Sequence, residues 1–140
     1  MIERNDINIM APVGSFESLM AAIQGGADSI YFGIEQLNMR ARSSHNFTMD
    51  DMLKIGSICK EYDIQTYLTV NTIMYDKDLD FMKAVIRKAK EQNIDAIIAS
   101  DQSAIQYARS VDIPVHISTQ LSISNIETIK FYSGYADVMV

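Results

Sequence analysis

Short runs of apolar and β-branched residues alternate along this chain with longer stretches in which apolar residues recur at helical spacing. The short runs end in Gly, Pro, Asn or Ser, and such an alternation is typical of βαβ units that build a parallel sheet. The predicted strands are 7–12, 28–33, 64–71, 95–100, 113–119 and 137–140, and the predicted helices are 15–25, 49–62, 78–92, 101–110 and 124–133. Ser15 and Thr48 stand where N-caps of the first two helices are expected. No linker divides the chain, so we predict one domain.

The predicted strands are of two alternating kinds, which indicates an internal repeat with a period of two strands. The odd strands open with Asp-Ile, and the even strands open with an apolar residue followed by Asp. These pairs are Asp6-Ile7, Asp63-Ile64 and Asp112-Ile113 in the odd strands, and Ala27-Asp28, Ile94-Asp95 and Ala136-Asp137 in the even strands. Counted from the opening aspartates, Asn71 and Gln120 have the same offset, and so do Tyr67 and His116.

Polar and apolar side chains alternate in the third and fifth strands, so each strand has one polar and one apolar face. In the third strand the polar face consists of Tyr67, Thr69 and Asn71, and the apolar face consists of Leu68 and Val70. In the fifth strand the polar face consists of His116, Ser118 and Gln120, and the apolar face consists of Val115 and Ile117. Inner strands of a doubly wound sheet are covered by helices on both faces and are nearly continuously apolar. The alternation favours instead a (β/α)8 barrel of the TIM type, in which the polar face lines the lumen.

A complete (β/α)8 barrel needs about 250 residues, whereas this chain has 140. We therefore predict an α/β fold, TIM-barrel-like and truncated to about five βα units plus a sixth strand. Residues 1–140 would be the N-terminal portion of the barrel, with the remainder and a C-terminal region absent. Exposed strand edges recruit partners, so the segment is expected to form a homodimer through them. The alternative is a doubly wound binding or receiver-like module that is complete at this length.

The charge and cysteine content exclude several classes of protein. Twelve Lys and Arg against 18 Asp and Glu give a net charge of −6, which excludes the broad basic face of a sequence-independent nucleic-acid binder, and we expect no DNA partner. A single cysteine, Cys59, excludes a disulfide framework and fits a reducing cytoplasm. The chain has neither a long apolar run nor a signal peptide at its start, so we expect no membrane partner.

Candidate binding residues follow the predicted strands, because the functional site of a parallel barrel gathers at the carboxyl ends of its strands. Segment 33–47 is longer than most βα loops. Its Arg40 and Arg42 could hold a carboxylate or phosphate through paired hydrogen bonds, or be solvated charges. Asn71 and Gln120 are carboxamides that could orient a polar, planar substrate, or could satisfy loop backbone.

Candidate catalytic residues are His116 and Asp101, which could move protons. His116 titrates near neutrality, although a lumenal histidine is as often a packing residue. Ser118, on the same face, is a further candidate for binding. Residues two apart on a strand are about 6.5 Å from each other, which is too far for His116 to activate Ser118 as a nucleophile. No metal site is expected, because His45, His116 and Cys59 lack the spacing of ligands.

Five motifs resemble, in order and spacing, the collagenase-like peptidase family, the thirty-second of the unclassified (U) peptidases. They are IMAPVG at 9–14, GADSIYFG at 26–33, LNMRAR at 37–42, YLTVNT at 67–72 and HISTQLSISN at 116–125. The resemblance spans essentially the whole chain and implies a (β/α)8 barrel at the N-terminus of a longer protein.

The resemblance implies two possible activities. The family carries a peptidase or collagenase label, yet several members are tied to oxygen-independent hydroxylation of RNA bases, with prephenate as donor, or of the ubiquinone ring, with a [4Fe-4S] cluster bound by cysteines. Those cysteines would lie beyond Val140. Because Cys59 does not match any of them, we expect no cofactor within this segment. The expected full-length protein is a prephenate-linked hydroxylase acting on an RNA base or related small ring, and the alternative enzyme is a true peptidase.

Overall fold

The computed structural model of this chain describes residues 3–35, 37 and 47–140, and all six of its strands run parallel in one sheet. The strands are β1 (Met10–Pro12), β2 (Ser29–Gly33), β3 (Gln65–Val70), β4 (Ala96–Ala99), β5 (Val115–Ile117) and β6 (Val138–Met139). The helices between them are α1 (Phe16–Gln24), α2 (Met49–Glu61), α3 (Leu79–Glu91), α4 (Gln102–Ser110) and α5 (Ile126–Tyr132). Short 3-10 helices cover Arg4–Asp6 (η1), Asp76–Asp78 (η2) and Thr119–Leu121 (η3).

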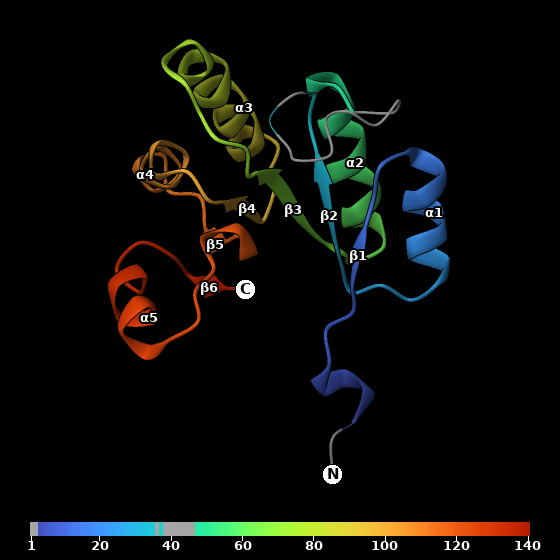
Figure 1. The fold of residues 1–140 in the computed structure, drawn as a ribbon. Coiled ribbons are helices and arrows are strands. Elements are labelled where there is room, and N and C mark those ends of the chain that lie inside the picture. The colour runs from blue at the N-terminus through green and yellow to red at the C-terminus, as the bar shows by residue number, and fades with distance from the viewer. Residues whose placement is uncertain (1–2, 36, 38–46) are drawn as a thin grey trace.

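The strand order shows that the sheet is a half-barrel. The strands follow one another as β1-β2-β3-β4-β5-β6 without a reversal, whereas a doubly wound sheet reverses its strand order at a switch point. Figure 1 shows the helices arranged around the outside of the strands. The predicted barrel architecture is therefore confirmed, and the doubly wound alternative is wrong.

The apolar core lies between the outer face of the sheet and the helices. Leu68 and Val70 of β3 and Val115 and Ile117 of β5 are fully buried there, as the alternating pattern predicts. The opposite face of β3 carries Tyr67, which is only partly buried. Among the described residues, no helix is long and apolar enough to cross a membrane.

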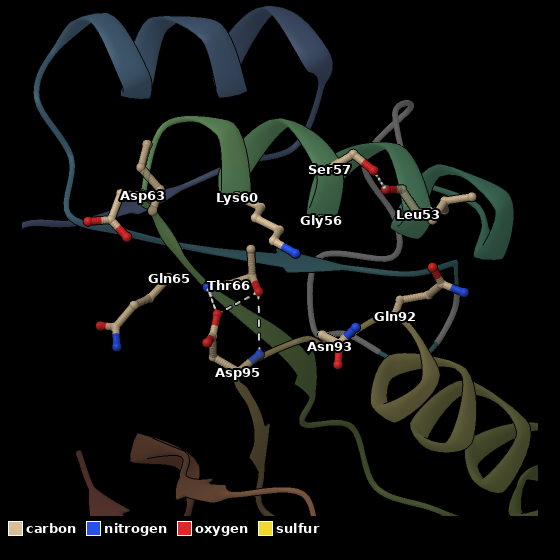
Figure 2. A pocket seen from close by; sticks show the side chains of 11 residues that line it. Leu53, Gly56, Ser57, Lys60, Asp63, Gln65, Thr66, Gln92, Asn93 and Asp95 are labelled. Atoms are coloured by element: carbon tan, nitrogen blue, oxygen red, sulfur yellow. Dashed lines mark hydrogen bonds between the residues drawn. The ribbon is translucent and has the colours of Figure 1, made fainter.

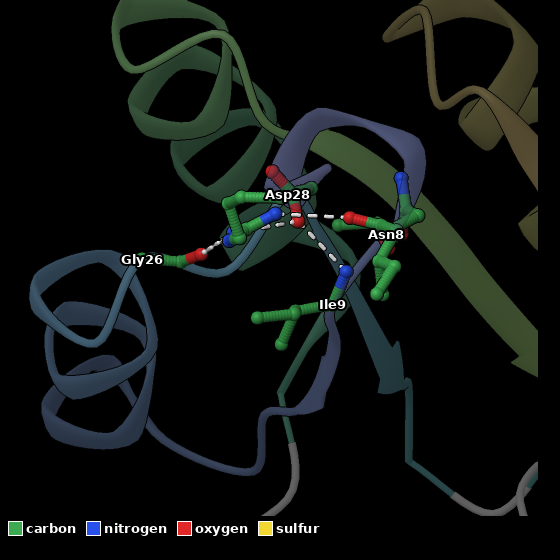
Figure 3. Close-up of polar contacts among 7 residues, drawn as sticks. Asn8, Ile9, Gly26 and Asp28 are labelled. Carbon is green, nitrogen blue, oxygen red and sulfur yellow. Dashed lines mark hydrogen bonds and ion pairs between the residues drawn. The ribbon is translucent and has the colours of Figure 1, made fainter. Parts of the chain in front are cut away.

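Each even strand is joined to the odd strand before it by one aspartate. The backbone N–H of each aspartate donates to the carbonyl of one residue in, or directly before, the odd strand, and its carboxylate accepts the N–H of that same residue. The pairs are Asp28 with Ile9, Asp95 with Thr66 and Asp137 with Val115, at 2.9, 3.0 and 2.8 Å for the first bond and 2.7, 2.7 and 2.8 Å for the second. Figure 3 shows the first pair, in which Asp28 also binds Arg4. These reciprocal pairs explain why an aspartate recurs at the start of each even strand.

The Asp-Ile pairs of the sequence repeat have a different role from the one predicted. Asp63 and Asp112 adopt left-handed backbone angles, with φ of 55° and 58°. The N–H of the following isoleucine, Ile64 or Ile113, then bonds back to the last turn of the preceding helix at 2.8 or 3.1 Å. This is the Schellman arrangement that ends a helix. These pairs therefore terminate α2 and α4 rather than open strands.

All six strands are shorter than predicted, and β1 and β5 differ most from their predicted ranges. β1 begins at Met10 and not at residue 7, because its partner β2 begins only at Ser29. β5 ends at Ile117 and not at residue 119, because the Ser118 hydroxyl accepts the N–H of Gln120 at 3.4 Å and starts the 3-10 helix η3. The two predicted N-caps are confirmed: Ser15 accepts the N–H of Ser18 at 3.1 Å, and Thr48 forms a capping box with Asp51.

Candidate functional site

The candidate site lies where β3, β4 and β5 end. Asn71 directly follows β3, Ser100 follows β4, and Ser118 and Gln120 follow β5. Neighbouring parallel strands end at the same rim, so these residues come from adjacent positions along it.

Ser100 connects the three strand ends. Its hydroxyl lies 3.2 Å from the backbone carbonyl of Asn71 and 3.4 Å from the Oε1 of Gln120. The hydroxyl of Ser118 donates to the same Oε1 at 3.3 Å. Asn71 and Gln120 thus lie at one rim, joined through the backbone of Asn71 and the side chain of Gln120, and their binding roles stay predictions. Ser100, for which no role was predicted, is the link between them. Its position immediately after a strand was the available signal.

Asp101 is held by its neighbours as a structural carboxylate. Its Oδ1 accepts the N–H and the hydroxyl of Ser103 at 2.8 and 2.5 Å, which caps α4, and its Oδ2 accepts the N–H of Met74 at 3.2 Å. Burial alone would raise the pKa of Asp101, but the hydrogen bonds from Ser103 and Met74 outweigh burial and hold that pKa below its ordinary value. The residue therefore fixes the loop that carries Asn71, and its role in moving protons stays a prediction.

His116 faces the interior and packs against Tyr67. The ring centroids of these two residues are 4.7 Å apart, with their planes inclined by 58°. Burial lowers the pKa of His116, and the nearby Asp137 only partly opposes that effect. The imidazole is consequently uncharged at neutral pH, which suits a proton acceptor or a packing ring better than a proton donor.

A serine nucleophile is not assembled at this rim. Ser118 is nearly fully buried, and its hydroxyl is engaged with Gln120. No hydrogen bond joins Ser118 to His116, although the structure describes both residues. Cys59 is buried under the outer face of the sheet, and burial raises the pKa of its thiol to about 11. Neither side chain is therefore an activated nucleophile.

Arg40 and Arg42 lie outside the described residues. Across residues 3–35, 37 and 47–140, no group of three or more His, Cys, Asp or Glu side chains is arranged to hold a metal ion.

A separate cleft of about 560 Å³ lies at the other end of the strands, between α2 and the turn from α3 to β4 (Figure 2). Its lining includes Lys60, Asn93 and the Asp95–Thr66 pair. In parallel barrels this amino-terminal end serves stability, whereas catalytic groups stand at the carboxyl ends. We therefore assign the candidate site to the rim of Asn71, Ser100 and Gln120.

The sequence profile of peptidase family U32 matches residues 14–138. The chain belongs to peptidase family U32. A solved structure of a family member, the U32 peptidase Mk0906, has a TM-score of 0.75 at 12% identity and covers 94% of this chain and 57% of that one. The half-barrel is therefore the U32 fold.

Two relatives of known name bear different functional names. A collagenase of Porphyromonas gingivalis is 59% identical over 136 residues, which are 97% of this chain and 33% of that protein. The tRNA hydroxylation protein P1 of Bacillus subtilis is 29% identical over 126 residues, which are 89% of this chain and 30% of that protein. This chain thus spans about a third of the length of either relative.

The residues present do not fit an iron–sulfur cluster of the kind that the family resemblance implies. A [4Fe-4S] cluster is held by four cysteine thiolates. This sequence has one cysteine, Cys59, which is buried in the core with its thiol protonated at neutral pH. No step of the proposed chemistry below is assigned to such a group within this chain.

Proposed function

We propose that the full-length protein is an oxygen-independent, prephenate-linked hydroxylase of RNA bases, and that the rim of Asn71, Ser100 and Gln120 holds the base. The observation that carries this proposal is that three strand ends meet at one hydroxyl, because Ser100 bonds both to the backbone carbonyl of Asn71 and to the side-chain Oε1 of Gln120. Enzymes that modify a base read its hydrogen-bonding edge with such donor and acceptor groups. The name of the Bacillus subtilis relative supports RNA as the substrate.

The remaining roles follow from the same arrangement. Arg40 and Arg42 would hold an anionic group of the donor or of the RNA, while His116 or Asp101 would move protons. An acidic chain with a net charge of −6 is a poor partner for phosphates. Most contacts to the RNA backbone would therefore come from a basic region outside this chain. The proposed location is the cytoplasm, where the RNA substrate is found.

The test is to replace Asn71 and Gln120 singly by alanine in the full-length protein and to measure hydroxylated nucleosides in cellular RNA by mass spectrometry. Each change removes a side-chain donor and acceptor from the base. We expect modification to fall by about ten-fold, the equivalent of roughly 1.4 kcal/mol, about the contribution of one hydrogen bond. Gln106→Ala is the matched control, because Gln106 is an exposed carboxamide on α4. Unchanged modification in both variants would remove the proposal.

The second candidate is a true peptidase, and the collagenase name of the 59% identical relative is the observation that favours it. A serine or cysteine mechanism within this chain is disfavoured, because Ser118 is not hydrogen-bonded to His116 and because Cys59 is buried. Cleavage of gelatin by the purified full-length protein, before and after chelation and in the presence of serine and cysteine protease inhibitors, decides between the two candidates. Cleavage that segregates with the protein through purification would favour the peptidase.

A further inference from the structure

The two rings of Tyr67 and His116 form a partly exposed aromatic surface inside the half-barrel, below the rim of Asn71, Ser100 and Gln120. Tyr67 comes from β3 and His116 from β5, with β4 between them. In a flat sheet, residues two strands apart are separated by about 9.6 Å, twice the spacing of neighbouring strands. The observed centroid distance of 4.7 Å shows that the two side chains lean toward each other across β4.

The residues between the rings leave room for this contact. Tyr67 is in register with Ala96 of β4, and His116 is in register with Ile98 of the same strand. Ala96 presents only a methyl group beside Tyr67 and is almost fully buried, and Ile98 beside His116 is buried as well. Tyr31 of β2 is in register with Tyr67 and shares its face, which extends the row of rings toward β2.

The aromatic row is fixed and electrically neutral. The hydroxyl of Tyr67 donates to the Oε1 of Gln65 at 2.9 Å, which holds the ring in one orientation. Burial, with a further effect of Asp95, raises the pKa of Tyr67, and burial lowers that of His116. Both rings are therefore uncharged at neutral pH, and both are only partly buried.

We propose that Tyr67 and His116 form the floor of the substrate site and stack against the planar face of a nucleobase, whose edge is turned toward Asn71 and Gln120. This inference rests on the proposed function for the choice of ligand. Neutral aromatic rings bind bases through their faces with little regard to sequence, while carboxamides select among edges. The floor and the rim together would recognise one base by its face and by its edge.

The experiment measures binding of uridine and cytidine to the full-length protein by titration calorimetry. Tyr67→Leu and His116→Leu remove a ring from the floor and should each weaken binding by about 5- to 150-fold, the range found when one stacking ring is lost. Tyr67→Phe keeps the ring and should bind within about two-fold of the wild type. Tyr62→Leu is the matched control, because Tyr62 is an exposed tyrosine at the end of α2.

A second measurement follows the wild-type protein, so it does not depend on whether the leucine variants fold. The imidazole protons of His116, assigned by comparison with His116→Gln, should shift in the NMR spectrum when cytidine is added to the wild type. Unchanged imidazole resonances at saturating nucleoside, or unchanged affinity in a folded Tyr67→Leu protein, would overturn the inference.

The outcomes separate this inference from the proposed function. If Asn71→Ala and Gln120→Ala abolish hydroxylation while Tyr67→Leu keeps its affinity, only the aromatic floor is wrong. If nucleosides bind in a Tyr67-dependent way but the protein hydroxylates no RNA, only the proposed hydroxylase activity is wrong.

Discussion

Replacing Asp95 by alanine tests whether the reciprocal aspartate pairs hold the strands together. The Oδ2 of Asp95 accepts the N–H of Thr66 at 2.7 Å and its hydroxyl at 2.9 Å (Figure 2). Thr66 is only 3% exposed, so its two donors lose their partner and are poorly placed to find water. A hydrogen bond to a charged group contributes about 1.5–3 kcal/mol when buried.

The expected loss is about 2–3 kcal/mol for the two bonds together, which is less than twice the value for one bond because the carboxylate of Asp95 itself is exposed. Asp137→Ala removes a single bond, from the N–H of Val115 at 2.8 Å, and should cost about half as much. Asp95→Asn keeps an acceptor oxygen without its charge and should fall between Asp95→Ala and the wild type.

Equilibrium unfolding in urea at pH 7, followed by far-UV circular dichroism, measures these differences. With a slope of about 2 kcal/mol per molar urea, the Asp95→Ala midpoint should drop by about 1–1.5 M. Glu61→Ala, which removes an exposed carboxylate from the last turn of α2, should leave the midpoint nearly unchanged. A loss below about 0.5 kcal/mol for Asp95→Ala, or a larger loss for Asp137→Ala, would refute the reasoning.

Three further predictions follow from the burial of single groups and from the open edges. Because burial lowers the pKa of His116 in the folded chain, the unfolded chain takes up the proton first. The free energy of unfolding should therefore be highest above about pH 6.5 and should decrease as the pH falls through the folded pKa. The His116→Gln substitution should flatten this part of the curve of unfolding free energy against pH. The Cys59 thiol, with its pKa raised to about 11, should resist iodoacetamide at pH 8 in the folded chain and react fully in urea; rapid labelling without urea would contradict its burial. The isolated segment should be a dimer by light scattering, because Met10, Val138 and Val140 leave apolar side chains exposed at the two edge strands; a monodisperse monomer at high concentration would exclude this.

The alternating pattern of β3 and β5 was sufficient to predict which residues face the helices and which face the interior. Leu68 and Val70 lie in the core, and Tyr67 meets His116 on the other face. This succeeded because side-chain alternation is a local property of a strand. The even-strand aspartates were also visible in the sequence, although their reciprocal bonding to the preceding strand was not.

The rest of the site depends on geometry that no local pattern contains. The contact of Tyr67 with His116 arises from the curvature of three strands, and the bridging role of Ser100 arises from the register of β3, β4 and β5. The early end of β5 depended on one serine hydroxyl, which turned the chain into η3. The Asp-Ile pairs were assigned to strands because a left-handed residue at the end of a helix leaves only a weak sequence signal.

The central claim is that the carboxyl-end rim of this half-barrel binds an RNA base. A crystal structure of the full-length protein with cytidine bound tests it most directly. We expect the base to lie above the rings of Tyr67 and His116, with its polar edge within hydrogen-bonding distance of Asn71 or Gln120. A base seated in the amino-terminal cleft beside Lys60 and Asn93, with the rim empty, would contradict it.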